Sequence, residues 1–385
     1  MVIGTIKGRH VMLSHRLLEL DFSQIANAWK KARHNQYSNN RKRSYHKKLG
    51  FLFDKLKDVD FAMLGETERK EYKEIMRFFS LSLEYLNHST MNTVPYELIY
   101  CLRCALKDWN SNSEHYVIVT SSGDYCFSYT LSLSKCVYDI IRTKLGIDFD
   151  DKLIQICLPQ NMERDYLCNA VLYHELGHFV DLSFGFSKLV FSELQTHFSE
   201  TEVKSFFPFL DDMSIPNDWK NIMVLNHLQE YFADLFASQY IGKAAYYYLD
   251  YIAGEYSMSN THPSTQNRIA LVNKFLSDSS SHLLFRIFRK FAQLVFHQEF
   301  KPKYLALANS DDFYRLIPCE LTDKNQLHTL FPYAWDIWLN NKDEFERYNS
   351  MSDPLKPVQK YMVLNNLIEK SINNYIVKEK WEKMS

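Results

Sequence analysis

The spacing of apolar residues over the first ninety-five positions predicts helices. Apolar side chains recur every three or four residues over 17–32 and 66–86, which is the period of one face of an amphipathic helix. Glycine and proline number only ten each in 385 residues, whereas aromatic residues make up 15% of the chain. This composition favours long helices with aromatic packing over an architecture of strands and turns. We therefore expect residues 1–95 to form a helical N-terminal region.

The pattern changes after about residue 96, where strands are expected between helices. Residues 116–120 have the composition of a strand, a turn containing serine and glycine follows, and 125–130 alternate in the manner of a second strand. These features predict a hairpin. A helix is expected over 136–146, and a short apolar strand over 153–158. The order of hairpin, helix, strand and helix indicates a small β-sheet.

Long helices are expected again in the second half of the chain. Asn161 is a favourable N-cap for a helix that runs to about residue 181, and a second helix is expected over 218–240. Residues 281–385 keep helical spacing of aromatic and aliphatic positions. The chain is thus expected to be mainly α with a small β-sheet (α+β). A central region, 96–280, is flanked by helical regions at 1–95 and 281–385.

Composition and charge narrow the class of protein. The net charge is −1, which gives no general argument for nucleic acid or an acidic membrane surface. No stretch of about 18 uninterrupted apolar residues occurs and no signal-peptide core is present, so a soluble protein without a membrane span is expected. The seven cysteines are odd in number and scattered from Cys101 to Cys319, which favours reduced thiols in the cytoplasm. Cys101 and Cys104 form a lone Cys-x-x-Cys, for which buried packing is favoured over a metal or redox role.

A basic segment at 30–48 is the strongest local concentration of charge. It contains Lys30, Lys31, Arg33, Arg41, Lys42, Arg43, Lys47 and Lys48. Such a run can bind an anionic partner such as nucleic acid, or it can form a solvated loop and helix face. Acidic residues follow soon after, so we favour the solvated face and expect no nucleic-acid partner.

Residues 173–179 read Tyr-His-Glu-Leu-Gly-His-Phe and contain the pattern His-Glu-x-x-His. Residues four apart on a helix project from one face, so His174 and His178 can both bind one tetrahedral zinc ion at about 2.0–2.1 Å. Glu175 lies about 100° further round the helix. It can take the proton from a zinc-bound water that attacks a carbonyl group. Apolar neighbours would bury the motif, and without a metal its polar groups would be unsatisfied.

A catalytic zinc usually takes a third protein ligand. Metzincins supply it from a longer motif with later glycine and histidine positions, but this chain has Asp181 and Phe184 there, which excludes that class. The later helix offers Glu230 and Asp234, four apart on one face and costly to bury without a cation. We assign Glu230 to the metal and Asp234 to the second ring nitrogen of a ligand histidine. His227 is the alternative third ligand; Asp181 is either a partner of the ligands or, as we favour, a polar residue at a helix end.

The pairing of His-Glu-x-x-His with a later Glu-x-x-Ala-Asp resembles the gluzincin zinc metallopeptidases. The Thr-His-Pro-Ser sequence at 261–264, followed by Arg-Ile at 268–269, is similar to the His-Pro…Arg-Ile stretch of CAAX-protease-type zinc endopeptidases in that group. The resemblance covers about residues 165–275. It implies a zincin-like catalytic core, with His262 near the substrate carbonyl as an oxyanion stabiliser and Arg268 bracing the site. That branch is typically embedded in a membrane, which this chain is not expected to be.

A purely structural role is the alternative for both residues. His262 can be a turn residue before Pro263, and Arg268 can be a salt-bridge partner. The favoured hypothesis is a soluble, cytoplasmic zinc-dependent endopeptidase that hydrolyses peptide bonds of a cytosolic protein. Its strands would hold an extended peptide as an added strand. The alternatives are a catalytically silent zinc-stabilised scaffold or binding protein, and a zinc amidohydrolase acting on a small-molecule amide. Retention of Glu175 beside an open zinc position argues against the scaffold.

Overall fold

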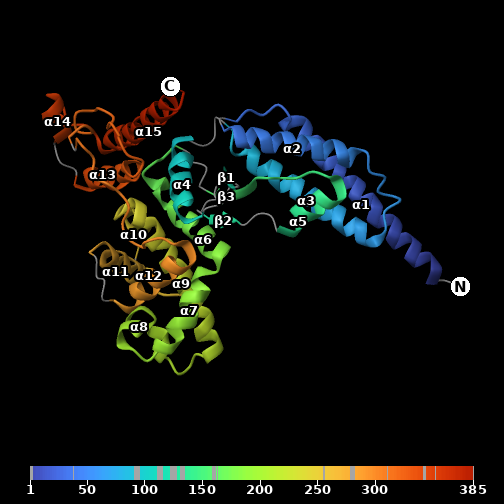
Figure 1. The fold of residues 1–385 in the computed structure, drawn as a ribbon, viewed down its shortest axis with the longest axis horizontal. Helices are drawn as coiled ribbons and strands as arrows, with labels where there is room; N and C mark the ends of the chain where they lie inside the picture. Colours follow the sequence, from blue (N-terminus) through green and yellow to red (C-terminus); the bar gives the residue numbers. More distant parts are fainter. Residues whose placement is uncertain are drawn as a thin grey trace. The chain divides into compact units, whose positions relative to one another are not determined.

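The chain is mainly helical, as the sequence predicts (Figure 1). The computed structural model describes residues 3–37, 39–90, 96–110, 116–121, 128–130, 135–157, 162, 164–254, 256–277, 282–309, 311–340, 344–351 and 353–384. Two compact units are present, and each is considered by itself. One comprises 1–96, 114–126 and 130–160, and the other comprises 97–113, 127–129 and 161–385. The division into three regions at 95 and 280 stays a prediction.

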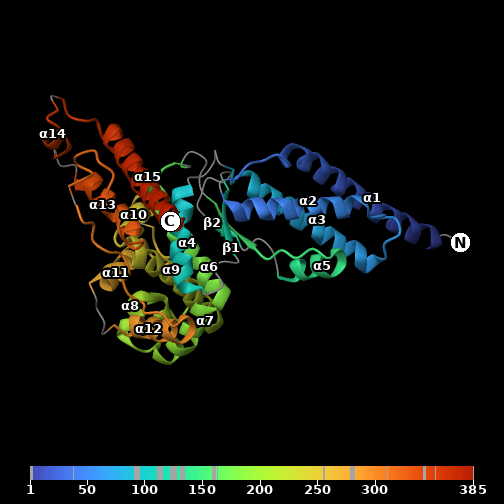
Figure 2. The same cartoon turned by 45° about the horizontal axis from the view of Figure 1, so that its top comes forward.

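Four helices and a pair of strands build the first unit. The helices are α1 (Ile3–Ala32), α2 (Asn40–Lys57), α3 (Glu66–Asn87) and α5 (Lys135–Leu145). The predicted helical spacing over 17–32 and 66–86 falls within α1 and α3, which pack together, and α2 packs on α3 (Figures 1 and 2). Leu49, Leu52 and Phe79 are fully buried in the shared core. Apolar side chains on the inner faces of these helices thus form a separate hydrophobic core.

The strands are β1 (Tyr116–Ser121), β2 (Ser128–Thr130) and β3 (Lys152–Cys157). β1 pairs in parallel with β3, with Tyr116 opposite Lys152 and Ser121 opposite Cys157. The strand order β1-β3-β2 places β3 next to β1, so the predicted hairpin is wrong. A parallel pair needs a crossover connection, and α5 lies between these two strands in the chain. The turn predicted for the hairpin falls outside the described residues.

Part of the basic segment at 30–48 is neutralised within the first unit. Lys48 Nζ contacts the carboxylate of Asp150 and donates to the backbone oxygen of Asp148 at 2.7 Å. Arg41 Nη1 lies 3.8 Å from Asp151 Oδ1. These pairs give two of the cations partners within the protein's own surface.

The second unit contains the remaining described helices, including those that carry the candidate site. They are α4 (Tyr96–Trp109), α6 (Leu172–Phe184), α7 (Phe186–Leu194), α8 (Thr201–Phe206), α9 (Asn217–Ile241), α10 (Ala244–Ala253), α11 (Thr265–Leu276), α12 (Leu283–Phe296), α13 (Gln326–Asn340), α14 (Glu344–Asn349) and α15 (Pro357–Glu382). The 3₁₀ turns are η3 (Cys168–Val171), η4 (Gln195–His197) and η5 (Pro208–Asp211). The helix predicted over 218–240 is confirmed as α9. None of the described helices combines the length and apolar character needed to cross a bilayer.

The helix that carries His-Glu-x-x-His begins later than its sequence suggests. The predicted start at Asn161, which lies outside the described residues, is wrong by about a dozen positions, because α6 begins at Leu172. Side chains of the preceding segment bond to nearby backbone instead. Asp165 Oδ1 accepts from the backbone nitrogen of Cys168 at 3.0 Å, and Asn169 Nδ2 donates to the Met162 oxygen at 2.6 Å. Local bonds of this kind compete with a regular helix and explain the delayed start.

The long segment between α6 and α9 folds back onto the middle of α9. Phe206, Phe207 and Phe209 are buried. The Tyr231 hydroxyl on α9 donates to the Phe206 oxygen at 3.0 Å, and the rings of Phe209 and His227 lie 5.1 Å apart. This apolar segment therefore has a structural role, which is to cover the face of α9 that would otherwise be exposed.

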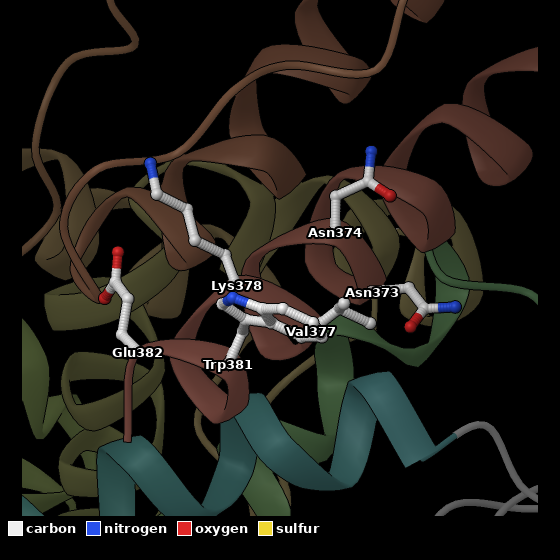
Figure 3. Close-up of a pocket in the computed structure, with 6 residues that line it drawn as sticks. All are labelled: Asn373, Asn374, Val377, Lys378, Trp381 and Glu382. Atoms are coloured by element: carbon white, nitrogen blue, oxygen red, sulfur yellow. The ribbon is translucent and has the colours of Figure 1, made fainter. Parts of the chain in front are cut away.

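The C-terminal helix α15 has one buried and one open face. Leu364, Ile368 and Ile372 are buried, whereas Val377 and Trp381 are 58% and 70% exposed. The exposed side chains line an open pocket whose six lining residues all lie on α15 (Figure 3). This pocket contains none of the residues that carry the site described below.

Helices α6 and α9 pack side by side with backbone in contact (Figure 1). A Cβ atom added to Gly177 of α6 would lie 2.8 Å from the Cα atom of Ala233 and 3.1 Å from Phe236 Cβ, both on α9. Side chains normally hold helix axes about 8–10 Å apart, so a glycine at the crossing point permits a closer approach. The sequence pattern did not predict this contact.

Replacing Gly177 with alanine tests the importance of this approach. Alanine is the better helix former by about 0.5–1 kcal/mol, but here its methyl group would overlap backbone atoms that cannot rotate away. We expect Gly177→Ala to lower the free energy of unfolding by about 1–3 kcal/mol, the usual cost of overpacking. Urea unfolding measures this change.

The matched control is Gly65→Ala, where the nearest atom to the added methyl group would be a side-chain oxygen of Glu68 at 3.8 Å. Because Gly65 is the N-cap of α3, where alanine is less favoured than glycine, this change should lower stability by no more than about 1 kcal/mol and without any overlap of atoms. Equal stability of the two variants would show that α6 and α9 tolerate separation.

Candidate metal centre

Helices α6 and α9 bring together three side chains that could hold a metal ion: His174, His178 and Glu230. The two Nε2 atoms lie 3.0 Å apart. Glu230 Oε2 lies 3.5 Å from Nε2 of His174, and Glu230 Oε1 lies 3.4 Å from Nε2 of His178. Each histidine therefore presents the same ring nitrogen to one shared point, where it meets the carboxylate of the facing helix.

The spacing of these atoms fits a small divalent cation. Metal bonds of about 2.0–2.1 Å in a tetrahedron separate neighbouring ligand atoms by about 3.3–3.4 Å. The observed separations of 3.0, 3.4 and 3.5 Å surround that value. His174 and Glu230 are each only 9% exposed. Two imidazoles and a carboxylate packed this closely in a buried position form a donor set suited to a metal.

Asp234 and Arg268 form a second layer behind the donor atoms. Asp234 Oδ1 lies 2.9 Å from Nδ1 of His174, within hydrogen-bonding distance. The guanidinium of Arg268, on α11, donates from Nε and Nη2 to both oxygens of Asp234, each at 2.7 Å. Arg268 Nη2 also lies 3.4 Å from Glu230 Oε2. When the proton of neutral His174 is on Nδ1, the lone pair on Nε2 points towards His178 and Glu230. This is the orientation that a metal ligand requires.

The pKa shifts of the cluster follow from burial and these contacts. Burial alone would lower the pKa of His174, but hydrogen bonds to Asp234 and Glu230 raise it to about 10. Burial, and then the charge on His174, lowers the pKa of His178 to about 4. Burial opposes ionisation of Glu230 and Asp234, yet His174 holds the first pKa and Arg268 the second below their usual ranges. With His174 neutral, as a metal ligand has to be, two carboxylates against one guanidinium leave a net negative charge that a cation would balance.

Glu175 is buried next to the donors without a partner of its own. It is 8% exposed, and within the described part of the chain it has no hydrogen-bond or ion-pair partner. Burial raises its pKa, while the charge on His174 opposes the shift. A carboxylate with a raised pKa and unoccupied oxygens can accept a proton and release it again.

His262 reaches the same cluster from a loop between α10 and α11. Its Nε2 lies 3.5 Å from Glu230 Oε1, and its side chain is 57% exposed. The side chain of His178 is 16% exposed. The donor cluster is thus buried on the side of Asp234 and Arg268 and reaches solvent on the side of His178 and His262.

The residues weighed as alternative ligands or as a second metal site are not part of the converging group. His227 is not among the converging donors, because its Nε2 donates to the backbone oxygen of Ser259 at 2.8 Å. Asp181 Oδ1 accepts from the backbone nitrogen of Ser187 at 2.6 Å, which makes it a polar residue at a helix end. Cys101 and Cys104 lie in α4 as free cysteines that form no disulfide, and burial raises the pKa of Cys104 to about 11.

Two features of the site have at most a weak signal in the motifs. One is the crossing of α6 and α9 at Gly177, for which a small residue inside each helical motif is the only hint. The other is the hydrogen-bonded loop around His262, which involves Ser259 and Thr261. Serine and threonine near a His-Pro pair indicate a turn, but not its bonding pattern.

Comparison with protein-family models, curated proteins and solved structures finds no match for this chain. Functional conclusions therefore depend on the geometry of the site.

The environment of Asp181 predicts a pH-dependent effect on stability. Burial raises its pKa to about 6, so the folded state binds a proton more tightly than the unfolded state, whose ordinary value is about 3.9. The contribution of Asp181 to the free energy of unfolding should therefore fall as pH rises from about 4 to about 6. Asp181→Asn keeps an oxygen acceptor for Ser187 without the charge. Its stability relative to wild type should rise over that pH range by up to about 3 kcal/mol, measured by urea unfolding at pH 4 and pH 7. A difference independent of pH would contradict this.

Metal binding is expected to depend on Glu230 and not on His227. Glu230→Ala removes one of the converging donors and leaves two imidazoles, so zinc bound per chain should fall strongly in elemental analysis after dialysis. His227→Ala on the same helix removes a hydrogen bond to the loop and should leave zinc content close to wild type. Loss of zinc in His227→Ala with retention in Glu230→Ala would reverse the assignment.

Proposed function

We propose that the chain is a zinc-dependent endopeptidase with a zincin-like catalytic core. The observation that carries the proposal is the convergence of His174, His178 and Glu230 beside an unpartnered, buried Glu175. A purely structural metal site has no use for a base next to its ligands, and such sites are usually closed and rich in thiolates.

Zinc is the metal that best fits the donors. Two imidazoles and one carboxylate are a common ligand set of catalytic zinc, which keeps one further position open. Zinc held there would act as a Lewis acid towards the substrate carbonyl and lower the pKa of an attacking water. The side chains named above supply the remaining functions.

Glu175 is proposed as the general base and then the general acid. Its carboxylate takes a proton from the water that attacks the scissile carbonyl and passes it to the leaving amine nitrogen. Burial favours the neutral form of the carboxyl group, so the acquired proton is stabilised between the two steps.

His262 is proposed to donate a hydrogen bond to the oxygen on which negative charge develops. Its Nε2 lies at the solvent-facing edge of the donor cluster, where a substrate carbonyl would enter. Asp234 and Arg268 act differently, because they hold His174 in orientation from the buried side.

The proposed partner is a protein or peptide substrate in the cytoplasm. The open side of the site, with His262 exposed and His178 partly exposed, is where an extended chain would approach.

A proteolysis experiment with Glu175→Gln tests the proposal. The substitution preserves side-chain size and removes the base, so zinc content should remain at the wild-type level while peptide hydrolysis falls at least about 100-fold, the usual scale of general-base catalysis. Zinc-loaded wild type and Glu175→Gln would each be incubated with a denatured proteome, and new N-termini would be identified by mass spectrometry.

Cleavage by wild type but not by Glu175→Gln would support the peptidase. Equal cleavage by both proteins would remove Glu175 from the mechanism. An absence of new N-termini from wild type with full zinc content would favour the silent scaffold or an amidohydrolase acting on small molecules.

A further inference from the structure

The loop that carries His262 is held by two residues of α9. Asn226 Nδ2 donates to the Asn260 oxygen at 3.2 Å, and His227 Nε2 donates to the Ser259 oxygen at 2.8 Å. Both residues lie within one turn of Glu230 on the same helix. The position of the loop relative to Glu230 is therefore set by a single rigid element.

Within the loop, the donor and acceptor roles in the hydrogen bonds of the Ser259 hydroxyl can be assigned. Its Oγ accepts from the backbone nitrogen of His262 at 3.0 Å and from that of Thr261 at 3.3 Å. A hydroxyl oxygen has two lone pairs, and both are then in use. The contact between Ser259 Oγ and Thr261 Oγ1 at 3.3 Å must consequently use the serine hydrogen.

This direction decides the role of the Thr261 hydroxyl. Because Thr261 Oγ1 accepts from Ser259, its own hydrogen is free to be donated to Nδ1 of His262, 2.8 Å away. A neutral imidazole that accepts at Nδ1 carries its proton on Nε2. On the other side of the ring, Nε2 faces Glu230 Oε1 at 3.5 Å, and an ionised carboxylate can only accept.

We infer that Thr261 is a positioning residue that holds His262 in the tautomer with its proton on Nε2, so that this nitrogen faces the metal-ligand cluster as a hydrogen-bond donor. The inference rests on the proposed function for its consequence, since an oxyanion stabiliser must donate from Nε2. Thr261 contacts neither the donors nor the site of attack and acts only through His262. Because Ser259 donates to Thr261 Oγ1, the hydrogen of the Thr261 hydroxyl is left to bond Nδ1 of His262.

The test replaces Thr261 with valine, which keeps the branched shape and removes the hydroxyl. The full chain, supplied with zinc and labelled with ¹⁵N at histidine, would be studied at alkaline pH, where imidazoles are neutral. Long-range correlation spectra of the rings identify the protonated nitrogen, and the His262 signal is assigned by its loss in His262→Gln. Wild type and Thr261→Ser should show the proton on Nε2, whereas Thr261→Val should show a mixture of tautomers.

Thr196→Val is the matched control. Thr196 Oγ1 donates to the Glu193 oxygen at 2.8 Å, in an exposed helical turn, so this variant loses one hydroxyl hydrogen bond without touching the loop. Its His262 signal should equal that of wild type. In peptide hydrolysis, Thr261→Val should lower kcat about tenfold with little change in KM, Thr261→Ser should restore it, and zinc content should stay constant.

The spectra separate this inference from the proposed function. A wild-type His262 with its proton on Nδ1, or a Thr261→Val spectrum identical to wild type, overturns the inference even if the protein cleaves peptides. A tautomer that shifts in Thr261→Val and returns in Thr261→Ser supports it even if wild type proves inactive, and the absent activity then counts against the peptidase alone.

Discussion

The close approach of α6 and α9 at Gly177 and Ala233 is the constraint on which the site depends. On α6, the histidine donors stand three residues before and one residue after Gly177. On α9, Glu230 and Asp234 have the same offsets from Ala233. Two pairs of side chains spaced by one helical turn therefore face each other across the point where the backbones touch. A wider separation would carry the carboxylate of Glu230 out of reach of the imidazoles.

Charge pairing makes this close packing tolerable. Burying a carboxylate is expensive unless an opposite charge and hydrogen bonds replace the lost water. Arg268 supplies both to Asp234, and Asp234 in turn faces Nδ1 of His174, so these two buried side chains each have a partner on the side away from the converging ligand atoms. The facing atoms of His174, His178 and Glu230 are those that could hold a cation, and Glu175 lies beside them without a partner among the described residues.

The sequence predicts the helical character and the donor residues because each depends on local spacing. Four-residue spacing on a helix fixes which side chains share a face, so the pairs on α6 and α9 can be identified without coordinates. Strand pairing is not local: the segments 116–120 and 125–130 suggest a hairpin, yet β1 pairs with the more distant β3. The start of α6 was misplaced because bonds from Asp165 and Asn169 to nearby backbone compete with helix formation. The contact at Gly177 depends on how two helices meet, which no single segment encodes.

Under the proposed function, the site combines ligands on rigid helices with a histidine on an exposed loop, an arrangement that suits a polymeric substrate. Its donors lie on two helices in backbone contact, where an error of a few tenths of an ångström would disturb the ligand spacing. His262 instead lies on an exposed loop, the kind of segment that often carries binding residues over a rigid scaffold. Asn226 and His227 attach that loop to α9, so the position of His262 is set relative to the helix that carries Glu230. Under the proposed function, His262 would meet the substrate carbonyl at the exposed side of the site, and substrates of different sequence would be held there without displacing His174, His178 or Glu230.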